Sequence, residues 1–490
     1  MSTLLIAIPL AGCLLVALAP ERLARALGVA VTGVLLVLAL VMVARYRLGG
    51  GIQYETDVAW IPGVDARFHL GVDGISLPLV VLTALLSFLC AVYTLHALPE
   101  PGRPRAFTSL LLALEVGMLG TFLALDLLLF FVFFEVVLIP MYFLIGTWGG
   151  GNRRYASTKF ILYTLLGSAV MLLGLLGIYA ATGTLDMVAL SADHGAGISR
   201  GVQILCFLAL FVGFGVKAPM WPLHTWLPDA HTEAPTVGSV LLAGVLLKMG
   251  TYGLVRIGLP ILPGGALVLA PALGVLAVIG ICYGALCCLA QRDLKRLVAY
   301  SSVGHMGFVL LGIATLTPIG VNAALFANLA HGVITGLLFF LAGSIKERYG
   351  TADLDVLGGG LATKFPALGG LLAFAAIASL GLPGLAGFWG EMLAMLGAYR
   401  PAADLNRPLF VTLMVLAGIG TVLAAAYFLV LLRRLNAGAV APRWRDIAYA
   451  DLGALELAIA ALLLVLTLAL GLYPRLVLGI TDPAVRAVFG

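Results

Sequence analysis

The sequence predicts an all-α, polytopic membrane protein with about fourteen transmembrane helices. Three observations lead to this fold class: a very apolar composition, a succession of apolar windows that can cross a bilayer, and two windows interrupted by proline and glycine. Of the 490 residues, 62% are hydrophobic and 10% are charged, whereas a soluble domain averages about 45–50% apolar and about 25% charged residues. The surface of a water-soluble protein could not hide this much apolar area, so we expect lipid to be the solvent.

Windows of about 20 apolar residues match the thickness of the hydrocarbon core of a bilayer. We expect spans at 3–20, 26–44, 75–96, 107–125, 127–147, 160–182, 202–228, 236–258, 265–289, 296–316, 321–344, 367–399, 409–432 and 454–474. The first window is interpreted as a span and not as a secretory signal, because Pro20 and Glu21 follow it in place of a small-residue cleavage site. Residues 45–72 are too polar to span and should form a surface loop with a short hairpin around 52–60.

The seventh and twelfth windows contain proline and glycine near their middle, at 213–222 and 381–391. Proline removes a backbone donor and breaks or kinks a helix, and a pair of broken helices in corresponding places is typical of inverted-repeat transporters. We therefore predict two inverted five-helix repeats with broken helices 7 and 12. The predicted units are an N-terminal three-helix segment at 1–106, repeats at 107–258 and 265–432, and a C-terminal span at 433–490. The alternative is two unrelated proline kinks in lipid-facing helices.

Basic residues in the connections predict the orientation, because they accumulate on the cytoplasmic side. One end of the spans collects Arg22, Arg25, Arg103, Arg105, Arg153, Arg154, Lys159, Arg292, Lys295, Arg296, Lys346, Arg348, Lys364, Arg433, Arg434, Arg443 and Arg445. The other end collects the smaller set Arg45, Arg47, Arg67, Arg200, Arg256, Arg400, Arg407, Arg475 and Arg486. We expect a bacterial inner (plasma) membrane protein with both termini on the periplasmic side. The net charge of +5 is thus a topology signal and does not indicate a nucleic-acid partner.

Several ionisable residues remain inside the predicted spans. They are Glu115, Glu135, Lys217, Lys248 and Glu391, with His224, His305 and His331 in or beside spans seven, ten and eleven. A charge at the bilayer centre costs about 2.5–3.5 kcal/mol on insertion scales, so these side chains should face the bundle interior and find partners. His231 and Glu233, by contrast, are expected in a polar loop.

This combination of groups favours a proton relay. Burial disfavours the charged form of an acid or a lysine and an approaching opposite charge restores it, while histidine titrates near neutral pH. A single glutamate–lysine pair could equally be a static contact that fixes helix packing. Two acids, two lysines and three histidines together make that alternative weaker.

Other chemistries have little support in the sequence. The six cysteines lack the Cys-x-x-Cys spacing of iron–sulfur or zinc sites, and the histidines within the spans show no i, i+4 pair that would bind a metal. A Walker phosphate-binding loop is also absent from the sequence. We therefore expect this chain to carry neither a cofactor nor a metal, and not to use ATP.

Four segments carry a resemblance to a known family. They are FGVKAPMWPLHTWLPDAHTEAP at 214–235, SVLLAGVLLKMGTYG at 239–253, FEVVLIPMYFLIGTW at 134–148 and AYSSVGHMG at 299–307. They resemble the antiporter-like, proton-translocating membrane subunits of respiratory complex I (NADH-quinone oxidoreductase). The resemblance covers essentially the whole chain. Within the family, Glu391 is similar to the glutamate of M-type subunits, where L-type, N-type and Mrp-type members usually carry lysine.

The resemblance implies roles and partners for this chain. Glu135 and Lys217 would form a couple, Lys248 would be the central station, and His305, His331 and Glu391 would carry the exit half, with His224 as a further relay residue. The partners would be neighbouring L- and N-type membrane subunits, and quinone, NADH, FMN and iron–sulfur clusters would belong to other subunits. A subunit of a Mrp-type cation/proton antiporter or of a membrane-bound hydrogenase remains the alternative.

Overall fold

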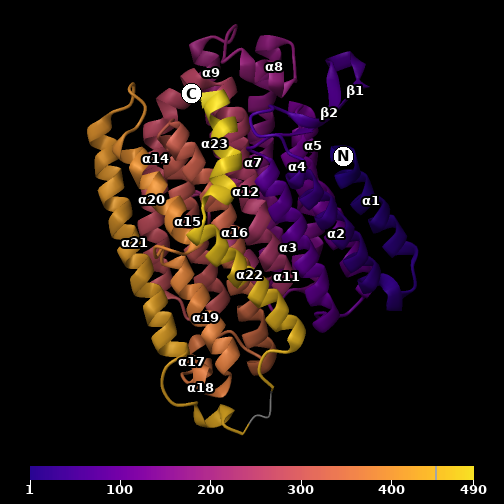
Figure 1. Ribbon diagram of the computed structural model, residues 1–490, viewed down its shortest axis with the longest axis vertical. Coiled ribbons are helices and arrows are strands. Elements are labelled where there is room, and N and C mark those ends of the chain that lie inside the picture. Colours follow the sequence, from indigo (N-terminus) through magenta and orange to yellow (C-terminus); the bar gives the residue numbers. More distant parts are fainter. Residues whose placement is uncertain (447–449, 490) are drawn as a thin grey trace.

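The computed structural model describes residues 1–446 and 450–489. It is a bundle of long helices that run roughly along one direction, with loops and short helices at the two ends (Figure 1). Twelve helical segments are long and apolar enough to cross a membrane. Two further expected spans are shorter: the first helix has 17 residues, and the twelfth span is divided into two helices of 14 residues each.

The N-terminal part pairs two lipid-facing helices with a hairpin and a buried helix. Its elements are α1 (Ser2–Leu18), α2 (Glu21–Ala44), β1 (Gln53–Ile61), η1 (Pro62–Val64), β2 (Ala66–Val72) and α3 (Leu77–His96). The two strands pair antiparallel, so the predicted hairpin is present and longer than expected. Asp65 turns the chain between the strands with a left-handed φ of 51°.

The next part contains the first broken helix. Its elements are α4 (Pro104–Leu123), α5 (Leu127–Val136), α6 (Leu138–Trp148), α7 (Arg153–Thr182), α8 (Met187–Ala192), α9 (Arg200–Lys217), α10 (Trp226–Glu233), α11 (Thr236–Leu241), the π-helical η2 (Leu242–Leu246), α12 (Leu247–Gly253), the π-helical η3 (Leu254–Gly258) and α13 (Leu259–Ile261). The predicted interruption of the seventh span lies between α9 and α10. The fifth span was expected to be continuous but divides at Val137, because Pro140 has no amide proton to donate to the carbonyl of Val136.

The last part contains the second broken helix. Its elements are α14 (Pro263–Ala290), α15 (Leu294–Ala314), α16 (Pro318–Tyr349), α17 (Leu354–Leu357), α18 (Leu361–Lys364), α19 (Pro366–Ser379), α20 (Ala386–Tyr399), α21 (Arg407–Leu435), η4 (Pro442–Trp444), α22 (Ala454–Leu472) and α23 (Arg475–Phe489). The twelfth span breaks between α19 and α20 as predicted. The sequence reading did not anticipate α23, an amphipathic helix whose buried residues Val477, Thr481 and Val485 are spaced four apart.

Burial separates the centre of the bundle from its rim. The apolar windows of the α11–α13 segment and of α16 are entirely buried, whereas those of α2, α7 and α21 are 28%, 39% and 33% buried. Helices with exposed apolar faces are suited to lipid contact. The two fully buried segments therefore define the axis on which polar side chains can meet inside the protein.

One polar contact fastens the hairpin to the bundle. His69 of β2 is 4% exposed; its Nε2 lies 2.7 Å from Oε1 of Glu55 and its Nδ1 lies 3.6 Å from Oδ2 of Asp186. Asp186 caps α8 by accepting hydrogen bonds from two backbone amides of that helix. The neighbouring Asp186 carboxylate raises the pKa of His69 above 6.5, and His69 in turn lowers the pKa of Asp186.

We expect this contact to be pH dependent. The carboxylates stabilise the imidazolium form of His69. Its contribution to the stability of the hairpin contact is therefore complete below about pH 6.5 and is lost as the pH rises through its raised pKa. The amides of β1 and β2 should therefore exchange hydrogen faster at alkaline pH, relative to His69→Gln protein measured at the same pH. His194→Gln, at an exposed histidine, is the control and should behave as the wild type. A His69→Gln protein that keeps the wild-type pH dependence would contradict this assignment.

Candidate functional site

The fully buried segments meet at a lysine and a histidine. Lys248 lies at the start of α12, directly after the π-helical turn η2, and is 0% exposed. Its Nζ lies 2.6 Å from Nδ1 of His331 in the middle of α16 and also donates to the carbonyl of Ala243. π-Helical turns often occur at functional sites, and this one sits where a buried amine contacts a buried imidazole.

From His331 the group of ionisable residues continues, through the ring of His305, to the second broken helix. The rings of His331 and His305 have centroids 5.7 Å apart, and Nδ1 of His305 lies 3.2 Å from Oε1 of Glu391. Thr421 donates to Oε2 of Glu391 over 3.4 Å. His305, His331 and Glu391 also line a cavity of about 20 Å³, and a polar cavity of this size has room for one water molecule.

The break in the twelfth span places Glu391 in this group. Gly381 has a φ of +72°, a conformation that favours glycine. A Cβ atom at Gly381 would lie 2.9 Å from Oε2 of Glu391, so the absence of a side chain there leaves space for the carboxylate. The unwound segment therefore both ends α19 and accommodates the acid at the start of α20.

Glu135 and Lys217 are both largely buried in the first half but are not joined by an ion pair within 4.0 Å. The Nζ of Lys217 lies 4.5 Å from the centre of the Phe134 ring, an arrangement that attracts a cation to the ring face. Lys217 Nζ and Glu135 Oε1 have no hydrogen-bond partner among the described residues. Buried groups of this kind are normally satisfied, so this half of the site has unused capacity to bind water or a proton.

The remaining predicted residues are buried but separate from these contacts. The ring of His224 packs against Tyr283 and Tyr300, with centroids 5.2 and 6.3 Å away, and both of its nitrogens lack a hydrogen-bond partner within the described chain. Both carboxylate oxygens of Glu115 are buried without a partner there as well. His231 was expected in a polar loop; this expectation is wrong, because His231 is fully buried and stacks on Phe339 at 4.6 Å.

Comparison with known proteins identifies the family. A model of the NADH:quinone oxidoreductase/Mrp antiporter transmembrane family matches residues 124–420. The chain is 42% identical to NADH-quinone oxidoreductase subunit M of Rhodobacter capsulatus over 95% of this chain and 90% of the relative.

The chain belongs to the NADH:quinone oxidoreductase/Mrp antiporter transmembrane family. Its fold superposes on a chain of respiratory complex I from Thermus thermophilus with a TM-score of 0.87 and 32% identity, covering 100% of both chains. It also superposes on a chain of the Mrp complex from Dietzia with a TM-score of 0.84 and 26% identity, covering 100% of this chain and 99% of the other. The resemblance inferred from the sequence motifs is therefore confirmed.

Within this family fold, two basic residues that the sequence assigned to aqueous connections are in fact buried. Arg256 is 9% exposed, and its Nη1 lies 2.5 Å from Oδ2 of Asp73. Lys295, in the first turn of α15, is 2% exposed, and its Nζ donates to the carbonyl of Ala234 over 2.5 Å. The sequence placed both near the ends of apolar windows, where a basic residue normally reaches water; only the packing of distant helices buries them.

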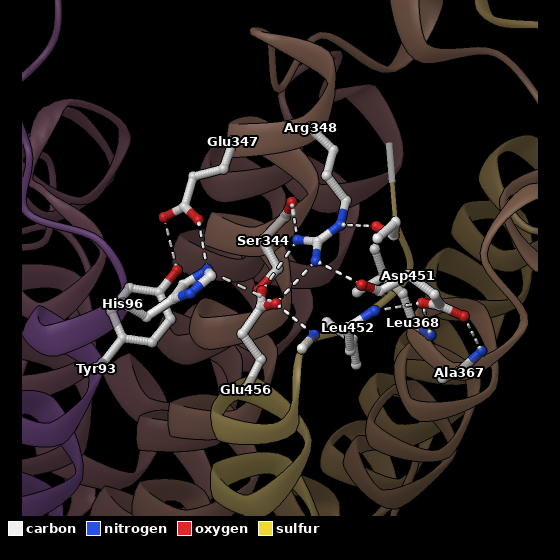
Figure 2. Close-up of polar contacts among 12 residues, drawn as sticks. Tyr93, His96, Ser344, Glu347, Arg348, Ala367, Leu368, Asp451, Leu452 and Glu456 are labelled. Atoms are coloured by element: carbon white, nitrogen blue, oxygen red, sulfur yellow. Dashed lines mark hydrogen bonds and ion pairs between the residues drawn. The ribbon is translucent and has the colours of Figure 1, made fainter. Parts of the chain in front are cut away.

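A third misassigned basic residue, Arg348 near the end of α16, belongs to a buried network (Figure 2). Its guanidinium donates to both carboxylate oxygens of Glu456 in α22, over 2.9 and 2.8 Å. It also donates to the carbonyls of Ala450 and Asp451, and the carboxylate of Asp451 accepts from the first amides of α19. Arg348 thus fastens the C-terminal span and its preceding loop to the central helix.

The same network contains a group of possible metal ligands from three helices. Ligand atoms of His96, Glu347 and Glu456 lie within 4.8 Å of one another. The two oxygens of Glu456 are already engaged by Arg348 and Ser344, and Glu347 accepts a hydrogen bond from Tyr93 over 2.7 Å. These carboxylates are satisfied by protein groups, so the arrangement is explained as a structural network without a metal.

We expect Arg348→Met to destabilise the attachment of α22. Removing one partner of a buried ion pair leaves an uncompensated charge and costs about 3–5 kcal/mol, whereas an exposed pair contributes about 0–1 kcal/mol. Thermal unfolding in detergent should therefore shift clearly for Arg348→Met and little for Arg434→Met, which removes a pair with the exposed Asp355. Equal shifts for the two variants would rule out a special role of the buried pair.

Proposed function

We propose that this chain is an M-type, proton-translocating subunit of an NADH:quinone oxidoreductase. In this proposal protons move through Glu135, Lys217, Lys248, His331, His305 and Glu391. The observation that carries the proposal is the buried group formed by Lys248, the two histidines and Glu391. Lys248 and Glu391 each contact one histidine, over 2.6 and 3.2 Å, and the centroids of the two imidazole rings are 5.7 Å apart. Each of these four side chains can both hold and release a proton, which a proton route requires and a static contact does not.

The separation of Lys217 from Glu135 supports a switching role for that couple. Two opposite charges that close from a large distance to 4 Å gain about 4 kcal/mol at an effective dielectric constant of 20. This energy changes a protonation equilibrium about a thousandfold. Movement of the Lys217 ammonium between the Phe134 ring and the Glu135 carboxylate would therefore be enough to load or unload the next site, Lys248.

The energy for transport must come from other subunits in this proposal. NADH oxidation with FMN and iron–sulfur clusters, and quinone reduction, would occur in partner chains. Neighbouring L- and N-type membrane subunits would pass the signal along the membrane as charge or movement. The Glu135–Lys217 couple is the part of the site that a neighbouring charge could bias, because its partners are not locked by hydrogen bonds.

The orientation and internal symmetry belong to the same proposal. The basic end of the bundle would face the cytoplasm of a bacterial cell and the termini would face the periplasm. The units 107–258 and 265–432 would be inverted repeats, each with one broken helix. His224, at the first break, would be an additional station between the aqueous face and the relay.

A second candidate is a subunit of a Mrp-type cation/proton antiporter, and the likeness to the Dietzia Mrp complex supports it. Two observations favour the first candidate. One is the presence of Glu391, and the other is that the identity to subunit M of Rhodobacter capsulatus, 42%, is higher than the 26% identity to the Mrp chain. Purification in mild detergent separates the two candidates. Co-purifying flavin and iron–sulfur subunits would support the oxidoreductase, and co-purifying antiporter subunits without redox centres would support the alternative.

We expect neutral substitutions in the relay to abolish pumping without preventing assembly. In the intact complex, Glu135→Gln, Lys217→Met, Lys248→Met and Glu391→Gln should each lower pumping-linked quinone reductase activity by at least about tenfold, because each removes a proton-holding group. Lys217→Arg should also be impaired, since arginine keeps its charge but does not release its proton. Glu21→Gln and Lys364→Gln, at positions outside the relay, are the controls.

Two results would contradict this proposal. Near-normal coupled turnover in both Glu135→Gln and Lys217→Met would exclude the couple from the mechanism. Variants that fail to assemble, while assembled protein pumps normally, would instead favour static pairs that fix helix packing. Assembly is measured on native gels, and pumping is measured as acidification of sealed vesicles driven by NADH.

A further inference from the structure

A large cavity with a mixed polar and apolar lining opens at the basic end of the bundle, apart from the relay contacts. It has a volume of about 480 Å³, and its lining includes Tyr93, Arg153, Glu233, Lys295, Lys346 and Glu347. The volume is enough for many water molecules. The lining residues come from the ends of α3, α6, α10 and α16 and from the first turn of α15, so five parts of the chain enclose the cavity.

The base of this cavity holds a buried amine that the relay does not include. Lys295 is 2% exposed, and its only hydrogen bond within the described chain is the one to the carbonyl of Ala234, at the end of α10. An ammonium group has three donors, so two remain free. No carboxylate lies within ion-pair distance of its Nζ among the described residues, which is unusual for a buried lysine.

Acidic groups surround the mouth of the cavity. Glu347 lies 35% exposed at the rim, where it accepts a hydrogen bond from Tyr93 and faces His96 at 3.7 Å (Figure 2). Glu233 also lines the cavity, and it accepts a hydrogen bond from the amide of Asn152 over 3.0 Å. Two carboxylates in the lining of a cavity that can hold water can collect protons and raise their local concentration.

A buried histidine lies between this lysine and the centre of the relay. His231 is on α10, three residues before the Ala234 carbonyl that Lys295 contacts. Its ring stacks on Phe339 of α16, the helix that carries His331 of the relay, with centroids 4.6 Å apart. Its two ring nitrogens have no hydrogen-bond partner among the described residues, so either nitrogen is free to accept or donate a proton.

From this arrangement we infer that Lys295 is the entry residue through which protons from the cavity reach Lys248. The Lys295 ammonium gives a proton to the imidazole of His231 by way of intervening water, because the two side chains are not in direct contact, and becomes a neutral amine. A hydronium ion in the cavity then protonates the amine and becomes water, while His231 passes its proton to the neutral amine of Lys248. This inference rests on the proposed function, because it supplies the relay with protons from one face.

The competing explanation is that Lys295 only anchors the end of α10 through Ala234. Both explanations predict damage when the side chain is removed. They predict different results for arginine at this position, because arginine keeps the charge and the hydrogen-bond donors but does not release its proton. They also predict a different dependence of pumping on the proton concentration in the cavity. If Lys295 is only an anchor, the loss of pumping in a variant should not depend on the pH at the cavity. If Lys295 is the entry residue, a higher proton concentration in the cavity should restore part of the pumping without it.

The experiment compares Lys295→Met, Lys295→Arg and Lys295→His in the intact complex with the matched control Lys346→Met. Lys346 lines the same cavity but is exposed. We expect pumping to fall by at least about tenfold in the methionine and arginine variants and to recover in part with histidine, which carries a proton. Turnover of Lys295→Met should rise as the pH on the cavity side falls, and Lys346→Met should match the wild type.

Normal pumping by Lys295→Met or Lys295→Arg would overturn the inference, and so would equal losses in Lys295→Met and Lys346→Met. If none of the three Lys295 variants assembles, the residue is a structural anchor and the inference is also wrong. Lys248→Met is measured in parallel. Loss of pumping in Lys248→Met with normal pumping in Lys295→Met would refute only the entry route, whereas normal pumping in Lys248→Met would refute the relay itself.

Discussion

Burial of ionisable side chains in an apolar helix bundle is the constraint on which the rest of this structure depends. A charge or an unpaired polar group in such surroundings is costly unless another group or water meets it. The buried ionisable groups of this chain divide into two classes. Arg256 with Asp73 and Arg348 with Glu456 are closed by direct ion pairs. Lys217, His224, His231 and Lys295 keep unused donors or acceptors, and these open groups follow the proposed proton route.

Irregular helix geometry occurs beside the ionisable residues of the proposed proton route. α9 ends at Lys217, the π-helical turn η2 ends two residues before Lys248, α5 ends beside Glu135, and α20 begins after the break that faces Glu391. Proline and glycine cause these interruptions because they remove a backbone donor or permit a positive φ. The freed backbone groups are tolerable only inside protein or beside water. The same residues that weaken the helices therefore create polar surroundings at the ionisable side chains.

The two closed ion pairs join helices and segments that surround the residues with unused donors or acceptors. Arg348 joins α16 to α22 and its preceding loop (Figure 2), and Arg256 joins η3 to the segment before α3. α16 also carries His331 and borders the cavity that contains Lys295. In the proposed proton route, a rigid central helix would keep the separation of these two sites constant while their protonation changes.

The sequence by itself determined the membrane class, the apolar segments, the two predicted broken helices and the family. These follow from composition, window length and local motifs, all of which are properties of neighbouring residues. It also identified Glu135, Lys217, Lys248, His305, His331 and Glu391 as ionisable groups within spans. Only the tertiary structure decided which of them touch, that Lys217 rests on the Phe134 ring, and that His231 and Lys295 are buried. The physical reason is that burial and partnership depend on helices far apart in the chain, and a basic residue at the end of an apolar window looks the same in sequence whether water or another helix covers it.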